Sequence, residues 1–186
     1  DPSIIIGPRH GVDAGVVDLG DGKVMVLKID PTFSMPALQQ HLGWAIVHIC
    51  ASDVACLGVI PRYMTICLLL PPGTSDALLE RIWTQVSDEC EKLGIAIVGG
   101  HTGIFPGISM PLNGGCCVIG LGTKEQLTPA SSARVGDRLI VTKGAAIEAG
   151  AILAMEGEKD LVRVLGRDIV EAGKKHFWDM SVVQDC

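Results

Sequence analysis

The stretch "YMTICLLLPPGTSDALLERIWTQVSDECEKLGIAIV", residues 63–98, predicts a strand, a helix and a second strand in direct succession. The apolar run over residues 63–70 is typical of a buried strand. Thr74 or Ser75 can cap the helix that follows, and Gly94 can end it. The apolar positions of this helix recur at three- and four-residue spacing and are Leu78, Leu79, Ile82, Val86 and Leu93.

The residues before this stretch predict further strands and one more helix. Residues 3–6 are expected to form a short strand, and residues 14–18 and 23–30 a hairpin around a Gly-Asp-Gly turn. Residues 37–58 predict a long helix. Because this helix is apolar on both sides, we expect it to be deeply buried.

The residues after the stretch predict a second unit that begins inside the chain. Residues 116–122 are expected to form a strand, which a polar connection over 124–134 follows. Residues 137–143 then predict another strand, with helices beyond it. The whole order predicts an α+β fold, with helices on one face of a mixed or antiparallel sheet. We expect an N-terminal domain over residues 1–130, and the beginning of a second α/β domain over residues 134–186.

Composition narrows the function classes. The chain has 186 residues, 48% of them hydrophobic, and a net charge of −6 with scattered basic residues, which argues against a nucleic-acid partner. Polar residues or proline interrupt every apolar run before the ~20 residues that a membrane span needs. The seven cysteines form no Cys-x-x-Cys pair, so we expect reduced thiols and a cytoplasmic protein. Because the chain begins at Asp1, we also expect a trimmed N-terminus.

Three aspartates at the ends or in the middle of apolar elements are candidate metal ligands. Asp13 precedes a strand, Asp30 closes a strand before Pro31, and Asp53 lies inside the apolar helix. A carboxylate in such a helix costs several kcal/mol unless it is paired, hydrogen-bonded or metal-bound. Each aspartate alone is also compatible with a structural turn or local hydrogen bonds. Together they are the oxygen ligands that Mg²⁺ uses beside nucleotide phosphates.

A glycine-rich segment at the end of the predicted strand 95–98 is the candidate phosphate site. Gly99 and Gly100 would let backbone N–H groups approach an anion, and His101 and Thr102 would follow as ligands or as ordinary turn residues. The segment lacks the Gly-Lys-Ser/Thr of a Walker loop. Lys143, before a predicted helix, is either an anion ligand or a surface lysine.

Five segments in order resemble the aminoimidazole-ribonucleotide (AIR) synthase-related superfamily. It includes the cyclising purine enzyme, thiamine-monophosphate kinase, selenophosphate synthetase and the hydrogenase-maturation carbamoyl dehydratase. The segments are "GVDAGVV" (11–17), "KIDPTF" (28–33), "ASDVACLGVIPRYM" (51–64), "VGGHTG" (98–103) and "GDRLIVTKGAAIEAGAILA" (136–154). The second and fifth look most like the hydrogenase-maturation branch. Ser52 departs from the asparagine of many relatives, and His101 from their acidic residue, although selenophosphate synthetases share Gly-Gly-His.

The resemblance implies a two-domain subunit that dimerises through its N-terminal sheet. It implies ATP bound across the dimer, with Mg²⁺ on Asp13, Asp30 and Asp53. The implied chemistry activates an amide or similar oxygen by phosphorylation, on a small-molecule or peptide-borne acceptor, and it assigns no catalytic residue here. Two alternatives stay open. One is a non-catalytic nucleotide-binding or dimerisation module, and the other is a phosphotransfer enzyme like selenophosphate synthetase or thiamine-phosphate kinase.

Overall fold

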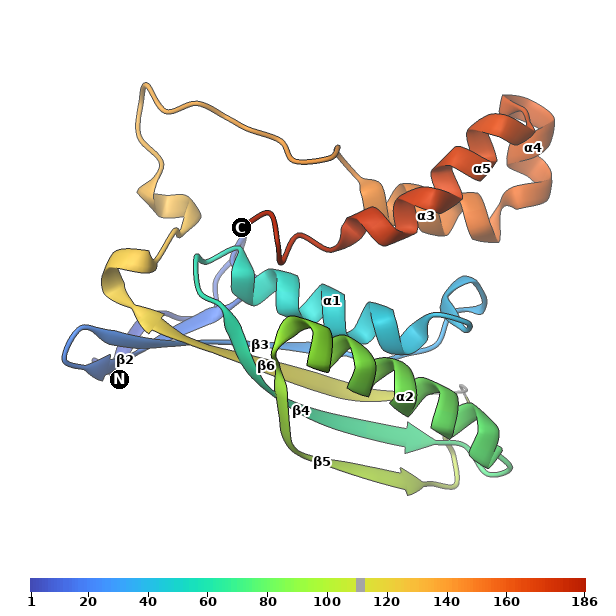
Figure 1. Ribbon diagram of the computed structural model, residues 1–186, viewed down its shortest axis with the longest axis horizontal. Coiled ribbons are helices and arrows are strands. Elements are labelled where there is room, and N and C mark those ends of the chain that lie inside the picture. Colours follow the sequence, from blue (N-terminus) through green and yellow to red (C-terminus); the bar gives the residue numbers. More distant parts are fainter. Residues whose placement is uncertain (110–112) are drawn as a thin grey trace.

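A computed structural model describes residues 1–109 and 113–186 as a six-stranded sheet with helices on one face (Figure 1). The strands are β1 (Ile4–Ile6), β2 (Gly15–Gly20), β3 (Lys23–Pro31), β4 (Pro61–Leu70), β5 (Ala96–Ile104) and β6 (Asn113–Thr123). The α-helices are α1 (Leu42–Ala55), α2 (Asp76–Leu93), α3 (Ile147–Glu156), α4 (Glu158–Leu165) and α5 (Arg167–Lys175). Short 3₁₀ helices are η1 (Pro36–Leu38), η2 (Lys124–Gln126), η3 (Ala130–Ser132) and η4 (His176–Met180). The predicted α+β class is confirmed.

Strand β6 joins two halves of the sheet, whose order is β1-β2-β3-β6-β4-β5. The first half is the antiparallel meander β1-β2-β3, and the second is β4 and β5, which run parallel and are connected by α2. β6 is antiparallel to both of its neighbours, so that Cys116 pairs with Asp30 on one side and with Ile66 on the other. In the described sheet the two halves are therefore joined only by the hydrogen bonds that β6 makes with β3 and with β4.

The two faces of the sheet differ in what covers them. Val24, Val26 and Val118 are fully buried on the face that α1 and α2 cover. Side chains that alternate with these point to the other face, where the described residues supply no helix. On this open face Ile29 is 71% exposed and Leu121 44% exposed. The open face therefore has apolar side chains that the described residues do not cover.

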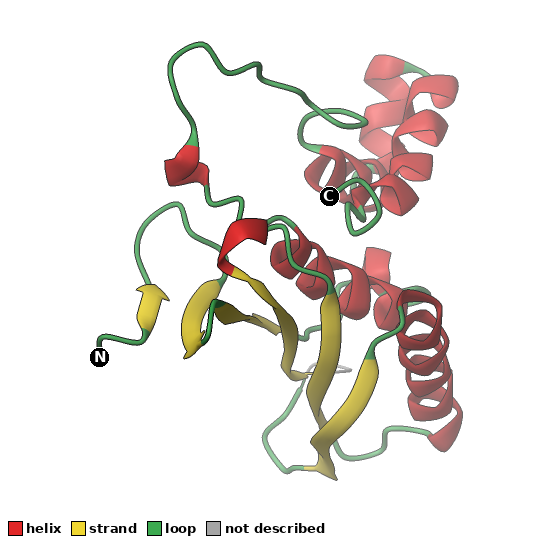
Figure 2. Cartoon of the chain, turned by 60° about the vertical axis from the view of Figure 1, so that its left-hand side comes forward, coloured by secondary structure: helices red, strands yellow, loops and turns green. Residues whose placement is uncertain are grey.

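Helix α1 is buried on almost every side because it lies between the sheet, α2 and the helices after residue 146 (Figure 2). Its contact with α2 depends on Gly43, where an added Cβ would lie 2.5 Å from both Gln85 Cβ and Ile82 O. The predicted caps of α2 are confirmed. The Ser75 side chain accepts a hydrogen bond from the backbone N–H of Leu78, and Gly94 ends the helix in the left-handed region.

Three sequence predictions are wrong. The helix expected over 37–58 is shorter, because η1 and a turn precede α1. The strand expected to stop before Gly99 continues to Ile104, because its backbone keeps pairing with β4 and this pairing needs no side chains. The strand expected over 137–143 does not form: Leu139 is 99% exposed, and no described strand pairs with this segment.

The segment 147–180 is helical and packs on α1 and η1. Phe177 and Ala151 are buried in one apolar cluster with Leu38 and Ala45. This packing closes the side of α1 that faces away from the sheet. No helix in the described parts of the chain is both long and apolar enough to cross a bilayer. The division at residues 130–134 stays a prediction.

Candidate functional site

The ammonium group of Lys28 holds two of the three candidate aspartates together. Its Nζ lies 2.6 Å from Asp53 Oδ2 and 3.2 Å from Asp30 Oδ1. Lys28 and Asp30 alternate with buried valines on β3, so both point to the helix-covered face, where Asp53 of α1 meets them. The two aspartates, 23 positions apart in sequence, therefore converge on one nitrogen atom.

Burial and like charge strain the ionised form of Asp53. Burial raises the pKa of Asp53, the ion pair with Lys28 opposes this, and the charges of Asp30 and Asp13 raise it again. For Lys28, burial would lower the pKa, but hydrogen bonds and charge from Asp53 and Asp30 outweigh burial and raise it. The ion pair thus stabilises the charged form of Lys28, but it does not fully offset the effect of burial on the charged form of Asp53. A further cation would relieve the remaining repulsion.

Asp13 shares a cavity with Asp53. This cavity, which we call the polar cavity, has a volume of about 390 Å³ and is also lined by Arg9, His10 and Thr128. A pair of carboxylates beside a guanidinium, an imidazole and a hydroxyl can hold a metal ion and phosphate oxygens at the same time. Asp30 lines a different cavity on the other side of the cluster.

The donor set fits a hard divalent cation bound together with other ligands. Asp30 Oδ2 is buried and has no hydrogen-bond partner among the described residues, so one carboxylate oxygen is available. Mg²⁺ prefers oxygen ligands and usually keeps waters and phosphates in its shell. Within residues 1–109 and 113–186, no three His, Cys, Asp or Glu side chains already surround a common point as a complete metal site. Asp13, Asp30 and Asp53 therefore do not form one three-ligand site as they stand, and an ion held by two of them would need further ligands.

Comparisons with known proteins identify the family of this chain. The family model described as "AIR synthase related protein, N-terminal domain" matches residues 11–121, which include Asp13, Asp30 and Asp53. The chain belongs to the AIR synthase related family. The resemblance predicted from the five sequence segments is confirmed.

Individual relatives of this AIR synthase related chain differ in their reactions. The selenide, water dikinase of Geobacter metallireducens is 31% identical over 157 residues, which are 83% of this chain and 45% of that protein. A structure of hydrogenase maturation protein HypE in complex with ATP is 26% identical, covers 67% of this chain and 37% of its own, and has a TM-score of 0.56. Thiamine monophosphate kinase from Aquifex aeolicus, 19% identical over 88% of this chain and 56% of its own, has a TM-score of 0.70 and shows the same fold.

The chain thus spans less than half the length of this curated relative. The comparisons therefore identify the family and the fold of the AIR synthase related chain, but not the reaction of the whole protein.

The structure places the predicted phosphate segment away from the three aspartates. Gly99, Gly100, His101 and Thr102 lie within β5, and β4 and β6 separate this edge strand from Asp30. His101 pairs with Cys67 and shares an open-face cavity with it, whereas Asp30 faces the helices. Within one AIR synthase related chain, the segment and the aspartates therefore do not meet.

Lys143 is engaged elsewhere. Its Nζ lies 2.7 Å from Asp185 Oδ2 and also donates to the backbone oxygen of Ser181. Lys143 is not among the residues that line the polar cavity or the cavity beside Asp30. Its expected position between a strand and a helix is also wrong, since residues 137–142 form no strand and α3 begins only at Ile147.

Lys28 is the residue that the sequence analysis missed. A lysine two positions before Asp30, on the same face of the strand as Val24 and Val26, needs a buried acidic partner, and this spacing could have identified it. His48, in contrast, is buried and bonded to the side chains of Glu89 and Ser181, at 3.1 Å and 2.7 Å. Burial lowers the pKa of His48 against the opposing effect of Glu89.

Proposed function

We propose that this chain is the ATP-binding part of an enzyme that activates an amide or similar oxygen by phosphorylation. The observation that carries the proposal is that Lys28 holds Asp30 and Asp53 together, while Asp13 shares the polar cavity with Asp53 and Arg9. The HypE structure with bound ATP supports nucleotide use and favours a role in hydrogenase maturation.

In this proposal Asp13, Asp30 and Asp53 hold Mg²⁺. The ion would neutralise phosphate charge and draw electron density from the transferred phosphoryl group. The raised pKa of Asp53 supports the assignment, because a divalent cation relieves the repulsion that raises it. Lys28 orients Asp30 and Asp53 toward one another, and Arg9 and His10 can hydrogen-bond phosphate oxygens in the polar cavity.

The open face of the sheet supports a homodimer. Ile29, Tyr63 and Leu121 expose apolar surface there, and a contiguous patch of this kind on a soluble protein marks an interaction surface. The segment 99–102 borders the same face, so its proposed contact with phosphate would be to the nucleotide of the second subunit. We propose Lys143 as a phosphate ligand only in this dimer. There its ion pair with Asp185 would have to break before its ammonium group could contact phosphate.

The test measures ATP binding to the purified chain by calorimetry, with and without MgCl₂. Asp53→Asn should lose the Mg²⁺-dependent part of the affinity, at least about tenfold or 1.4 kcal/mol, because the ion loses an anionic ligand. Asp21→Asn, on an exposed turn, is the matched control and should bind like the wild type. Normal Mg²⁺-dependent binding by Asp53→Asn would refute the metal site.

One observation favours a second candidate function, phosphotransfer to selenide. The curated relative at 31% identity is a selenide, water dikinase, and this chain carries Gly-Gly-His at 99–101. ATP turnover measured with and without selenide separates the two reactions. Binding of Mg-ATP without turnover by the full-length protein, in the presence of either acceptor class, would instead support a non-catalytic module.

A further inference from the structure

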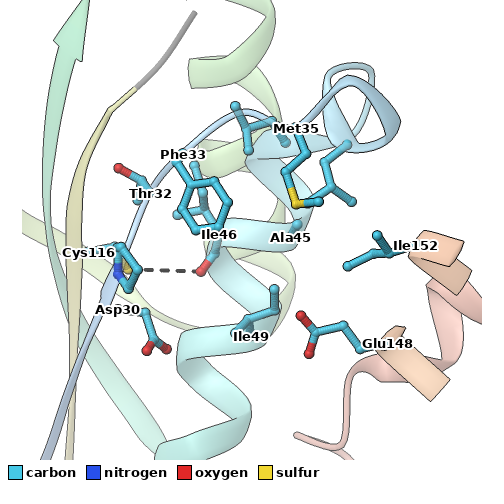
Figure 3. A pocket seen from close by; sticks show the side chains of 13 residues that line it. Asp30, Thr32, Phe33, Met35, Ala45, Ile46, Ile49, Cys116, Glu148 and Ile152 are labelled. Atoms are coloured by element: carbon cyan, nitrogen blue, oxygen red, sulfur yellow. Dashed lines mark hydrogen bonds between the residues drawn. The ribbon is translucent and has the colours of Figure 1, made fainter. Parts of the chain in front are cut away.

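A second cavity lies on the other side of the carboxylate cluster, between the end of β3, α1 and α3 (Figure 3). Its volume is about 200 Å³, below the ~300–1,000 Å³ of sites for drug-sized ligands. The walls are mainly apolar and include Phe33, Met35, Ile46, Ile49 and Ile152. We call it the apolar cavity. Its size and walls suit a compact hydrocarbon group rather than a nucleotide.

The charges of the apolar cavity are all of one sign. Asp30 and Glu148 line it, and none of its lining residues is lysine, arginine or histidine. Figure 3 shows the two carboxylates on either side of Ile49. Lys28 pairs with Oδ1 of Asp30, while Oδ2 is buried without a hydrogen-bond partner among the described residues. A buried acceptor in this state favours a ligand that brings a donor and positive charge.

Helix α3 fixes Glu148 at this cavity. Glu148, Ile152 and Glu156 follow one another at four-residue spacing, so they lie on one face of the helix. The first two line the cavity, and Glu156 accepts a hydrogen bond of 2.7 Å from the backbone N–H of Ala37 in η1. Glu148 is thus held over an apolar cavity by an anchor two turns away.

We propose that the apolar cavity binds the acceptor substrate, and that this acceptor carries, besides the oxygen that is phosphorylated, a compact apolar group with a cationic nitrogen, an ammonium or amidinium. The apolar body contacts the walls, and the nitrogen donates to Glu148 and faces Asp30. The inference rests on the proposed function in one respect, since Asp30 is also proposed to hold Mg²⁺; the partner of the acceptor nitrogen is therefore Glu148, and Asp30 adds negative charge at the inner end of the cavity. Anionic acceptors are disfavoured because two carboxylates face them across an apolar wall.

The test uses probes that differ only in the charged end. Binding of n-butylammonium, n-butyramide and n-butyrate to the nucleotide-free chain is measured by NMR titration. We expect n-butylammonium to bind at least about tenfold more tightly than n-butyrate, with n-butyramide between them. Equal affinities, or tighter binding of n-butyrate, would overturn the proposal.

Two variants locate the binding. Glu148→Gln should weaken n-butylammonium binding about fivefold or more and leave n-butyramide nearly unchanged, and Ile152→Phe should abolish binding of both by filling the cavity. Glu171→Gln on α5, away from the cavity, is the matched control. Unchanged binding of n-butylammonium by both cavity variants would refute the site. The probes are titrated without nucleotide, so this test is separate from the ATP-binding test. If the chain binds n-butylammonium as expected but does not bind Mg-ATP, only the proposed function is refuted. If it binds Mg-ATP but not n-butylammonium, only this inference is refuted.

Discussion

Replacing Lys28 by methionine tests the carboxylate cluster directly. Methionine keeps the length and apolar packing of the side chain but removes the ammonium that contacts Asp30 and Asp53. Breaking a buried ion pair on one side costs about 3–5 kcal/mol, because the remaining charge is left unpaired. The Lys28 side chain is 15% exposed and that of Asp53 26% exposed, so water screens part of the loss. We therefore expect Lys28→Met to lower the free energy of unfolding by about 2–4 kcal/mol at pH 7.5.

The loss should depend on pH in a definite direction. The folded-state pKa of Asp53 is already above its usual value of 3.8 and should rise further without Lys28. A carboxyl group whose pKa is higher in the folded than in the unfolded state does not destabilise the fold below its unfolded-state pKa. It lowers the free energy of unfolding as the pH rises from there through its folded-state pKa. The deficit of Lys28→Met should therefore shrink as the pH falls from 7.5 to 5. Millimolar MgCl₂ at pH 7.5 should also restore part of it, since the ion would replace the missing charge.

The assay is urea unfolding of the wild type and Lys28→Met at both pH values, with and without MgCl₂. Lys124→Met is the matched control, because Lys124 pairs with Asp18 at 2.5 Å on the surface, where such pairs contribute about 1 kcal/mol or less. A deficit that is the same at pH 5 and 7.5 and unaffected by MgCl₂ would refute the reasoning. Lys28 would then act through packing alone.

Three further changes have expected outcomes. Gly43→Ala should cost about 1–3 kcal/mol in thermal or urea unfolding, because the new Cβ overlaps α2, whereas Gly150→Ala, with open space around it, should be neutral or stabilising; equal effects would contradict the close helix contact. His48 has a lowered pKa, so stability should be complete above pH 6.5 and fall as the pH drops, and urea unfolding of His48→Gln should show a weaker dependence; parallel profiles would exclude His48 as the cause. Leu121→Glu should convert a dimer into a monomer in sedimentation at micromolar concentration, and a wild-type monomer would exclude the open-face dimer.

Local pattern predicted most of the fold because most elements here are locally consistent. The stripe and caps of α2 and the hairpin of β2 and β3 follow from residues close in sequence. The errors arose where tertiary pairing decides. Glycines that look like a strand end remain in β5 because β4 pairs with them. The apolar residues 139–141 form no strand and are solvent-exposed, because no described strand pairs with them.

The candidate site was predictable where a charged residue lies in an apolar stretch of sequence. Asp53 in an apolar helix signals a buried partner from sequence alone. Which residue is that partner depends on how α1 packs on β3. This packing joins residues far apart in sequence, so no local pattern predicts it, and Lys28 was missed. His101 shows the opposite limit. Its neighbours suggest an anion site, but its pairing with Cys67 puts its side chain on the open face, and two strands separate β5 from β3.

The position of β6 in the sheet sets an order of events during synthesis. Among the described strands β6 is the last to be made, yet in this sheet the meander β1-β2-β3 and the unit β4-α2-β5 pair only through it. A chain emerging from a ribosome at ~5–20 residues per second therefore carries two incomplete sheets, with unpaired edges on β3 and β4, until residue 123 is free. During that interval the nascent chain presents apolar strand edges to its neighbours, which is the condition under which chaperones bind and polysome-bound copies aggregate.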